Sequence, residues 1–524
     1  MRLSTDEAIV AAVGAGMAVF DTARAYEDNE RLLAGALRRC GADAGARVIT
    51  KGGMARPGGA WVPDGRAKAI LADCEASLEA IDGLPIDLYL IHAPDPRTPW
   101  RTSVRALNRL VDEGLVKRVG VSNVNRGQLD EALGFAPIAA VQVALSVFDD
   151  RALRGGVVER CSEAGVEVIA HSPLGGPRRV KGLARQAALV EVAAAHDATP
   201  AQVALAWLLD LAPGIVAIPG ARRAESARSA AAAATLELTE SERIVLARAF
   251  GSARPQRPRV SGDGEVVVVM GIPGAGKTRV AQDYSERGYI RLNRDERGGS
   301  LRALADALEQ ELAAGARRVV LDNTYLTRAA RSYVIDAAGR HGLAARCVWL
   351  DTPLAQAQVN IVERRLDGDD VLAPTSQMRT LRELEPPAQD EGWTTVERVP
   401  FQRAPGAGEA GVFVAAAALD QPGWVRHTDR DAPHLVFDWR PGATAEALAA
   451  AAAAVAAEVS GPVEAALCPH PAGPPRCWCR PPLPELVLAF ARAHRIDPAR
   501  STLIGTGPAH RTLAATLGAR YAGI

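Results

Sequence analysis

The sequence has no excess of either charge, since 61 Lys and Arg residues balance 61 Asp and Glu residues over 524 positions. A chain without net charge creates no overall field toward nucleic acid, so a phosphate-binding site would need a local basic cluster. The chain also lacks long apolar runs other than alanine-rich tracts, and polar and charged residues follow Met1 closely. We therefore expect a soluble, cytoplasmic protein that does not bind membranes.

Cysteine is scarce, and its distribution is uneven. Four of the seven cysteines are scattered, which indicates reduced thiols rather than a disulfide framework. The other three gather near one histidine, at Cys468, His470, Cys477 and Cys479. Three thiolates and one imidazole on a short loop suit a closed tetrahedral Zn²⁺ site, and the alternative is that they are buried packing residues.

A chain of this length is too long for one hydrophobic core and suggests about three domains. Residues 251–264 are rich in Gly, Pro and Arg without periodicity, which is typical of a linker, and a second Gly-rich break precedes residue 412. The sequence thus predicts domains at residues 1–250, 265–403 and 412–524.

The clearest motif lies near the middle of the chain. Residues 265–278 read EVVVVMGIPGAGKT, a β-branched apolar run followed by a glycine-rich loop. This spacing matches the P-loop, whose backbone N–H groups surround phosphate while its lysine and hydroxyl contact phosphate and Mg²⁺. We expect ATP and Mg²⁺ at Gly271, Gly274, Gly276, Lys277 and Thr278, and the alternative is a plain turn after a core strand.

The first 250 residues alternate short apolar runs with segments of helical periodicity. There are seven such runs: AVFDTA, RVITK, LYLIH, RVGVSN, AVQVAL, EVIAHSPL and IVAIPG. Residues 67–81 and 102–113 carry apolar positions at helical spacing. The pattern predicts an α/β fold with a parallel TIM barrel, in which an eighth strand would precede the first run.

Polar side chains follow these runs where a barrel carries its active site. They are Asp21, Tyr26, Lys51, His92, Ser122, Asn123, Gln142 and Ser172. A cation close to a phenol makes it a better proton donor, and a carboxylate can fix that cation. Each residue alone would more often be a helix cap, surface residue or core histidine.

The motifs FDTARAYEDNE, VITKGG, LIHAPD, GVSN, AHSPL and IPGA resemble the aldo-keto reductases across residues 1–250. The resemblance implies NADPH-dependent reduction of a small carbonyl substrate, with Tyr26 as general acid, Lys51 and Asp21 tuning it, and His92 orienting the carbonyl. It also implies contacts of Ser122, Asn123 and Gln142 with the nicotinamide amide. Further along the cofactor it places Ser172, Leu174, Gly220 and Arg223. The chain departs from the family at MRLST in place of a first strand, at Leu145 in place of an aromatic ring, and at Ser229 and Ala230.

Phosphoryl transfer needs a cation cradle, Mg²⁺, an acid to accept the hydroxyl proton, and mobile arginines. Lys277, Thr278, Asp295 and Arg364 or Arg365 can fill these roles, although Asp295 alone could be a turn cap and the arginines a solvated helix face. GIPGAGKT, LNRD, LDNTYLTRAAR, VERR and PTSQMRTLRELEPPAQDEGW resemble the kinase domain of polynucleotide kinase-phosphatases. That resemblance implies Asp295 as base on a 5′-hydroxyl, Asp322 near metal and substrate, and Arg364 or Arg365 as lid arginine.

Nucleic-acid ends are one substrate class for this domain, and a small-molecule hydroxyl is the alternative. Five arginines could form a phosphate-binding surface: Arg291, Arg294, Arg297, Arg328 and Arg331. Few aromatic residues interleave them, and the nearby candidates for base stacking are Tyr289, Tyr325 and Tyr333.

Residues 412–524 read as a small α/β unit with helices over 443–459 and 484–494. CPHPAGPPRCWCRPPLPELV and IDPARSTLIGTG resemble the zinc-bearing haloacid-dehalogenase-type sugar and histidinol phosphatases. Those enzymes need an acidic nucleophile pair at the first strand, where this chain reads VAAAALDQ, and an acidic Mg²⁺ ligand after the last, where it reads Gly505-Thr506-Gly507-Pro508. Asp438 is a lone carboxylate on another strand. We therefore expect an inactive phosphatase-like domain.

The leading hypothesis is an ATP-dependent kinase fused to an NADPH-dependent reductase, and a role in repairing aldehyde-bearing nucleic-acid ends would join the two activities. One alternative is a metabolic reductase with a regulatory ATP-binding domain. The other is a nucleotide-sensing scaffold without catalysis.

Overall fold

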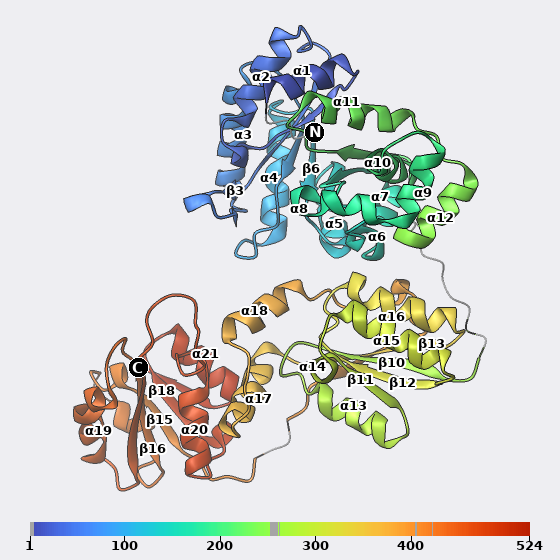
Figure 1. The fold of residues 1–524 in the computed structure, drawn as a ribbon. Coiled ribbons are helices and arrows are strands. Elements are labelled where there is room, and N and C mark those ends of the chain that lie inside the picture. Colours follow the sequence, from blue (N-terminus) through green and yellow to red (C-terminus); the bar gives the residue numbers. More distant parts are fainter. Residues whose placement is uncertain (1–4, 252–259, 261, 404–405, 422) are drawn as a thin grey trace. The chain divides into compact units, whose positions relative to one another are not determined.

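The computed structural model describes residues 5–251, 260, 262–403, 406–421 and 423–524. The chain divides into two compact units, Met1–Gln256 and Arg257–Ile524 (Figure 1). Much of the predicted linker, at 252–259 and 261, lies outside the described residues, as do residues 1–4 of the MRLST segment. In the described part of the chain, no helix is long and apolar enough to cross a membrane.

The first unit is a parallel sheet of seven strands in the order β1-β2-β5-β6-β7-β8-β9. Each predicted apolar run forms one strand, so the predicted parallel barrel is confirmed with seven strands in the described residues. The strands are β1 (Val19–Asp21), β2 (Arg47–Gly52), β5 (Ile86–Ile91), β6 (Arg118–Ser122), β7 (Ile138–Ala144), β8 (Glu167–His171) and β9 (Ile215–Ile218). A two-stranded hairpin, β3 (Met54–Ala55) and β4 (Val62–Pro63), follows β2.

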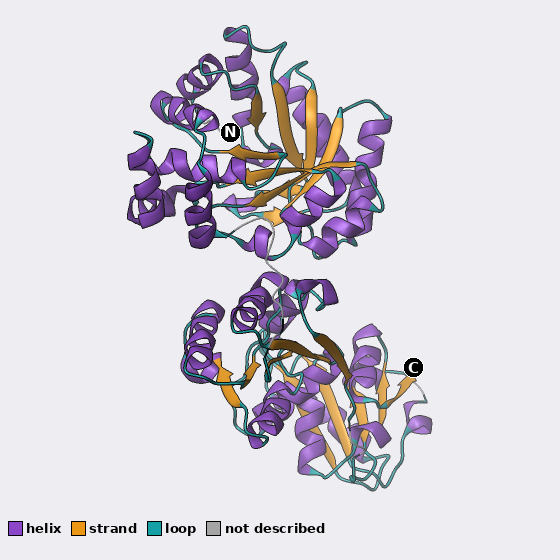
Figure 2. Ribbon diagram, turned by 90° about the vertical axis from the view of Figure 1, so that its right-hand side faces the viewer, coloured by secondary structure: helices purple, strands orange, loops and turns teal. Residues whose placement is uncertain are grey.

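Helices lie outside these strands (Figure 2). They are α1 (Asp6–Gly14), α2 (Asn29–Arg39), α3 (Ala67–Ile81), α4 (Trp100–Asp112), α5 (Arg126–Leu133), α6 (Arg151–Arg154), α7 (Val157–Ala164), α8 (Gly176–Arg179), α9 (Ala187–Ala195), α10 (Pro200–Asp210), α11 (Ala224–Ala232) and α12 (Glu240–Phe250). Several begin at a side-chain cap that satisfies free backbone N–H groups, as Asn125, Thr199 and Thr239 do in capping boxes.

The apolar residues of the barrel strands divide between two cores. A large cluster joins outward-facing strand residues such as Tyr89 and Val121 to the helices. A small one lies on the other face of the strands and contains Ile49, Leu90 and Ile169. This alternation along each strand fixes which side chains face the helices and which face the inside of the barrel.

The second unit contains two five-stranded parallel sheets. The first has the order β11-β12-β10-β13-β14, with β10 (Glu265–Met270), β11 (Ile290–Asn293), β12 (Arg318–Asp322), β13 (Ala344–Asp351) and β14 (Thr395–Pro400). Its helices are α13 (Lys277–Glu286), α14 (Arg294–Arg297), α15 (Leu301–Ala313), α16 (Arg328–Arg340), α17 (Leu354–Leu366) and α18 (Pro374–Glu383). The central strand β10 is buried on both faces, as its valine run predicts.

The second sheet has the order β17-β16-β15-β18-β19. Its strands are β15 (Val412–Ala415), β16 (His434–Trp439), β17 (Val463–Cys468), β18 (Thr502–Gly505) and β19 (Arg520–Gly523), and its helices are α19 (Ala449–Ala456), α20 (Glu485–Ala493) and α21 (Pro508–Leu517). The helix predicted over 443–459 is shorter than expected. Residues Ala445–Leu448 form a 3₁₀ turn before α19, and β17 begins at Val463, soon after Gly461 and Pro462 interrupt the alanine-rich pattern.

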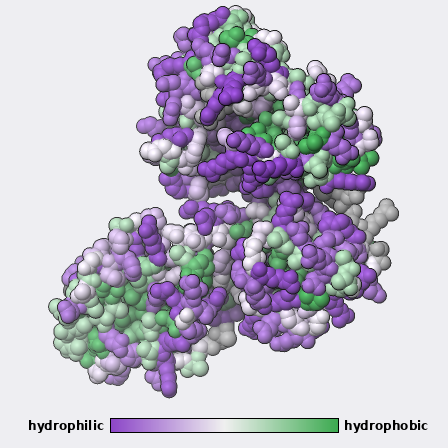
Figure 3. Space-filling model, in the orientation of Figure 1, coloured by the Kyte–Doolittle hydropathy of each residue, from purple (hydrophilic) through white to green (hydrophobic). Residues whose placement is uncertain are grey.

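Hydrophilic residues cover much of the face shown in Figure 3. Apolar residues are most evident there over the part of the second unit that contains α19. Because α19 consists of seven alanines and one valine, its exposed side is necessarily apolar. The predicted α/β class holds for the three parallel sheets.

Candidate active sites

A buried ion pair lies at the carboxyl ends of β1 and β2. Lys51 Nζ is 2.7 Å from both carboxylate oxygens of Asp21 and also donates to the Thr22 carbonyl at 2.7 Å. Gln142 Nε2 donates to Asp21 Oδ1 at 2.8 Å. Two buried charges are stable only when both are paired and hydrogen-bonded, and this network meets that requirement.

Tyr26 and His92 lie beside this pair. Tyr26 ends a 3₁₀ turn after β1, and Lys51 Nζ lies 5.2 Å from the centre of its ring. The imidazole of His92 meets the phenol edge to face, with ring centroids 5.6 Å apart. The structure thus brings together the four predicted residues Asp21, Tyr26, Lys51 and His92.

The imidazole of His92 is neutral at physiological pH. Burial, and then the charge of Lys51, lower the pKa of His92 to about 3. The side chain is 8% exposed, and its buried Nδ1 has no hydrogen-bond partner among the described residues. A neutral imidazole can donate one N–H to a ligand oxygen without carrying charge.

A second polar group follows β6 and β8. Asn123 Nδ2 donates to the His92 carbonyl at 2.9 Å and lies 3.1 Å from Ser122 Oγ. Asn123 and Ser172 have φ of +57° and +53°, in the left-handed region that non-glycine residues seldom occupy. Such strained residues cluster at functional sites, because the surrounding fold must hold them in place.

Two residues of this region were not predicted from the sequence. His171, the last residue of β8, places Nε2 3.0 Å from Asn123 Oδ1 and Nδ1 3.2 Å from Ser172 Oγ. Its position at a strand end was the available signal. Trp61, in the β3–β4 hairpin, has its ring 6.1 Å from that of Tyr26 and 5.6 Å from that of His92.

The remaining predicted residues follow β8 and β9. Leu174 is half-buried against the large core, Gly220 is exposed, and Arg223 is the N-cap residue of α11. They lie on the same edge of the barrel as the polar group, since the strands are parallel. Leu145 is fully buried.

The predicted P-loop connects β10 to α13. Lys277 Nζ donates to the carbonyls of Gly271 and Ile272 at 3.1 and 3.0 Å, folding the side chain back over the loop. Gly274 has φ +87°, and a Cβ there would lie 2.3 Å from the Ala357 carbonyl oxygen. Only glycine fits that position, because backbone atoms cannot move aside cheaply.

Burial lowers the pKa of Lys277 to about 8, against the raising effect of the carboxylates Asp322 and Asp295.

Asp322, buried at the end of β12, accepts from Arg291 Nη2 at 2.9 Å and from Asn293 Nδ2 at 2.7 Å. Asn293, which the sequence reasoning missed, also accepts from the backbone N–H of Asp295 and Glu296. It therefore positions Asp295, whose side chain is 78% exposed. Thr278 follows Lys277 in the first turn of α13 and is exposed.

The two candidate lid arginines face different ways. The charge of Arg364 contributes to the lowered pKa of Lys277, and its guanidinium pairs with Asp369 at 3.0 Å. Arg365 instead pairs with Glu485 of α20 at 2.8 Å. Of the two, Arg364 is the one whose charge adds, after burial, to the lowered pKa of Lys277.

The prediction of a five-arginine surface is wrong for two of the five residues. Arg331 is fully buried and pairs with Glu391, and Arg328 is 9% exposed and pairs with Asp390. Tyr325, a candidate for base stacking, is also fully buried. The two arginines lie within the fold on α16, where each guanidinium has the carboxylate partner that burial requires.

The Cys/His loop, defined here as residues 468–479, brings its four donor atoms together. Those of Cys468, His470, Cys477 and Cys479 lie within 4.8 Å of one another. Cys468 Sγ is 3.6 Å from Cys477 Sγ and 3.5 Å from His470 Nδ1, and Cys479 Sγ is 3.4 Å from that nitrogen. Ligands about 2.3 Å from a tetrahedral Zn²⁺ lie at comparable separations, so the residues fit the metal.

Among the described residues, no acidic pair lies at the carboxyl end of the central strand β15. Ala416 and Ala418 are buried there. Asp438, near the end of β16, pairs with Arg440 at 2.8 Å. After β18, the Thr506 backbone N–H donates to His510 Nδ1 at 3.2 Å.

Two protein families match the chain: the Aldo/keto reductase family over residues 3–244, and an AAA domain over residues 266–387. The chain is 33% identical over 261 residues to aldo-keto reductase str7 of Strobilurus tenacellus, covering 44% of this chain and 76% of that protein. It is 30% identical over 268 residues to probable aldo-keto reductase 1 of Glycine max, covering 43% and 73%.

Solved structures match the same half of the chain. An aldo/keto reductase from Klebsiella pneumoniae in complex with NADP and acetate is 29% identical, covering 48% of this chain and 87% of that one, with a TM-score of 0.42. A glycerol dehydrogenase from Gluconobacter oxydans is 26% identical, covering 49% and 88%, with a TM-score of 0.43. The sequence matches to the curated relatives show that, through its first unit, the chain belongs to the aldo/keto reductase family.

Proposed function

We propose that the first unit reduces a small carbonyl compound with NADPH. The observation that carries this is the juxtaposition of the Tyr26 phenol, the buried Lys51–Asp21 pair and the neutral imidazole of His92. NADPH supplies the hydride that reduces the carbonyl carbon. Tyr26 gives its hydroxyl proton to the carbonyl oxygen, Lys51 stabilises the phenolate that remains, and His92 holds that oxygen through an N–H.

The other predicted residues bind the cofactor in this proposal. Ser122, Asn123 and Gln142 hold the nicotinamide amide, and Ser172, Leu174, Gly220 and Arg223 lie along the rest of NADPH. The orphaned Nδ1 of His92 and the strained backbone of Asn123 and Ser172 support a polar ligand in this place. The NADP complex of the Klebsiella pneumoniae relative is consistent with the same choice of cofactor.

Tyr26→Phe tests the reductase. Removing a positioned proton donor lowers turnover by about 10²–10⁴-fold, so NADPH oxidation with a panel of small aldehydes falls accordingly. Binding of NADPH, followed by its fluorescence, stays near the wild-type value. Tyr89→Phe is the matched control, because Tyr89 is a buried barrel tyrosine that donates to the Ile70 carbonyl. Equal turnover in Tyr26→Phe and wild type would refute the role.

We further propose that residues 265–403 transfer phosphate from ATP to a hydroxyl. Lys277 and the P-loop amides bind the phosphates, and Thr278 with Asp322 holds Mg²⁺. Asp295 accepts the substrate hydroxyl proton as the new O–P bond forms and ADP leaves, while Arg364 stabilises the charge on the transferred group. The AAA-domain match and the Asp322–Asn293–Asp295 arrangement support this reading.

The substrate is tested with labelled ATP. We expect transfer to 5′-hydroxyl DNA or RNA oligonucleotides, and the competing class, small polyols and sugars, is assayed in parallel. Asp295→Asn abolishes transfer and keeps ATP binding, whereas Asp306→Asn, at an exposed position of α15, changes neither. ATP binding without transfer to any hydroxyl would favour the alternatives, a regulatory nucleotide domain or a scaffold. If ATP binding regulates the reductase, Lys277→Ala changes the response of the NADPH oxidation rate to ATP.

We also propose that Cys468, His470, Cys477 and Cys479 bind one Zn²⁺ in a structural site with four protein ligands. Burial raises the pKa of the Cys468 and Cys479 thiols, so a bound cation is what would hold them as thiolates. The expected zinc content is about one per chain, falling in Cys477→Ser but not in Cys347→Ser, which alters a buried cysteine of β13.

A further inference from the structure

Helix α17 contacts both the P-loop and the hydrophobic core of the C-terminal sheet. Asn360 Nδ2 donates to the carbonyl of Gly274 in the P-loop at 2.8 Å. On the same helix, Val359, Ile361 and Val362 belong to the hydrophobic core that contains Phe413 and Phe437 of the C-terminal sheet. A displacement of α17 would therefore reach the phosphate-binding loop directly.

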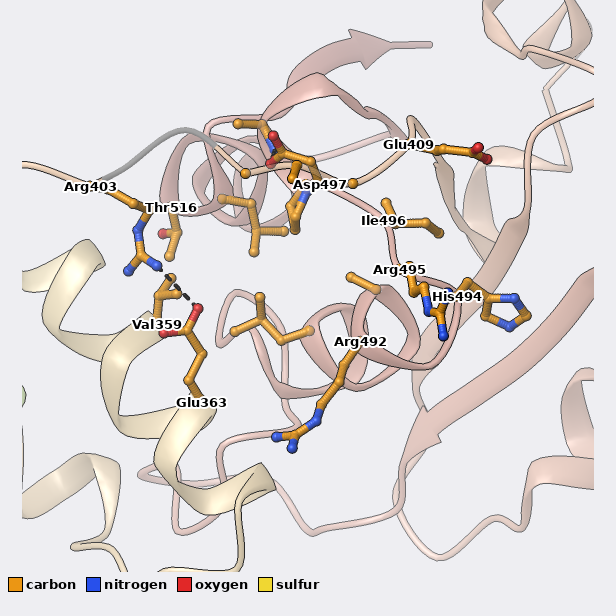
Figure 4. A pocket seen from close by; sticks show the side chains of 18 of the residues that line it. Val359, Glu363, Arg403, Glu409, Arg492, His494, Arg495, Ile496, Asp497 and Thr516 are labelled. Atoms are coloured by element: carbon orange, nitrogen blue, oxygen red, sulfur yellow. Dashed lines mark hydrogen bonds and ion pairs between the residues drawn. The ribbon is translucent and has the colours of Figure 1, made fainter.

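Packing around this helix is incomplete. A cavity of about 750 Å³ separates part of α17, at Val359 and Glu363, from residues 494–497 that follow α20 (Figure 4). A second cavity of about 600 Å³ lies between residues 365–373 and the Cys/His loop. Cavities remove neighbouring atoms that would otherwise hold a segment, so the position of α17 depends more strongly on its core packing and on the polar contacts beside the cavities.

Specific contacts between residues 365–372 and the C-terminal sheet come from the Cys/His loop and from α20. Trp478, which is 2% exposed, donates its indole N–H to the Leu372 carbonyl at 3.0 Å. Arg365 pairs with Glu485, the first residue of α20. Arg492 pairs with Asp367 at 2.6 Å, but both side chains are more than half exposed, so this pair contributes little.

The contact at Leu372 continues to the P-loop through α18. That helix begins at Pro374, two residues after Leu372. One turn further, the fully buried Gln377 donates through Nε2 to the carbonyl of Pro273 in the P-loop at 3.1 Å. A short path of hydrogen bonds and helix thus runs from Trp478 to the loop that surrounds phosphate.

We propose that the metal-loaded Cys/His loop is a positioning element for the P-loop, acting through Trp478, residues 366–373 and Gln377. Trp478 lies between two of the metal ligands, Cys477 and Cys479, so fixing their sulfur atoms fixes the indole between them. The inference rests on the proposed zinc and ATP sites. It gives the C-terminal sheet, which lacks the acids of a phosphatase, a role in shaping the nucleotide site.

The test uses the full chain and two matched tryptophan variants. Trp478→Phe keeps a buried ring and removes the indole N–H, so the sulfur ligands remain. Trp424→Phe makes the same change in a buried tryptophan of a 3₁₀ turn, Trp424–His427, which packs on the opposite face of the same sheet. Zinc content, hydrogen exchange of residues 271–276 and 372–378 without nucleotide, and the Kd for ATP are measured for each.

We expect Trp478→Phe to keep its zinc, to exchange faster in both segments, and to bind ATP more weakly by up to about fivefold, the limit set by the net contribution of one hydrogen bond. Trp424→Phe should match wild type in both segments. Chelating zinc from the wild type should reproduce the exchange change of Trp478→Phe and add nothing in that variant.

Wild-type exchange in both segments for zinc-loaded Trp478→Phe would overturn the inference. Because exchange is measured without nucleotide, that result is separate from a failure of the proposed ATP site, which would show as no ATP binding in the zinc-loaded wild type. A protein that never binds zinc yet has protected segments would also overturn it.

Discussion

Lys51 Nζ lies 2.7 Å from each carboxylate oxygen of Asp21, and both side chains are buried at the mouth of the barrel. Neither charge is satisfied without the other, because the surrounding residues supply one amide from Gln142 and one carbonyl from Thr22. The integrity of the pair therefore matters for the stability of the barrel as well as for its proposed chemistry.

Breaking this pair should destabilise the barrel. Lys51→Met leaves Asp21 as a buried, unpaired charge, which costs about 3–5 kcal/mol. Hydrogen exchange of the β1 and β2 amides in the full chain measures the local free energy of opening. The double variant Lys51→Met/Asp21→Asn should recover part of the loss, since no buried charge then remains. Arg109→Ala, which removes an exposed pair with Glu113, should cost less than about 1 kcal/mol. A loss in Lys51→Met as small as that would contradict the assignment.

The buried His92 predicts how stability depends on pH. Its pKa falls from 6.5 in the unfolded chain to about 3 in the folded protein, so the folded state binds fewer protons between these values. Stability from this group is complete above pH 6.5 and decreases as the pH falls toward 3, by at most about 1.4 kcal/mol per pH unit. His92→Gln should flatten the stability profile over this range, without removing the contributions of His171, His434 and His510, whose pKa values burial also lowers. An unchanged profile in His92→Gln would show that His92 is protonated in the folded state.

The barrel was predictable because each of its strands corresponds to an apolar run that ends in polar residues. All seven runs form strands, and Asp21, Tyr26, Lys51 and His92 meet as their positions implied. Parallel strands bring their carboxyl ends to one edge, so residues far apart in the chain become neighbours.

What the sequence could not give was the direction of long side chains. Arg364 and Arg365 are adjacent, yet Arg364 pairs with Asp369 and Arg365 with Glu485. Arg331 looked like part of a basic surface and is instead buried against Glu391, 60 residues away. Such partners depend on tertiary packing, which local pattern does not encode. The same reason hid Trp61, which lies beside Tyr26 and His92, and the contact of Asn293 with Asp322.

The lowered pKa of Lys277 predicts pH-dependent nucleotide binding. Burial brings this pKa from 10.5 to about 8, so the free protein loses the ammonium charge as the pH rises through 8. Phosphate favours the charged form of Lys277, so the Kd for ATP should increase between pH 7 and 9.5. Binding near pH 8.5 should be accompanied by the uptake of a proton. The stability of the protein without nucleotide changes with pH in the opposite direction to its affinity for ATP. The free energy of unfolding rises from pH 8 to 10.5, because the folded state binds fewer protons than the unfolded state in this range. Calorimetry in buffers of different ionisation enthalpy measures the proton uptake. Lys277→Arg, always charged, should show none, and equal uptake in both proteins would assign the proton to another group.

Alanine substitutions at two glycines of the P-loop distinguish the effect of backbone strain from that of steric exclusion. Gly274 and Gly276 have similar φ values, +87° and +93°, so alanine at either position costs about 1–2 kcal/mol for the left-handed backbone. At Gly274 the new Cβ would also lie 2.3 Å from the Ala357 carbonyl oxygen, whereas at Gly276 it meets nothing within 4 Å. Gly274→Ala should therefore push the loop away from α17 and weaken ATP binding far more than Gly276→Ala. Titration with ATP and hydrogen exchange of residues 271–276 compare the two variants. If Gly276→Ala proved the more damaging, the tight approach of the loop to α17 would not be what sets its shape, and direct contact of Gly276 with the phosphates would be the explanation to pursue.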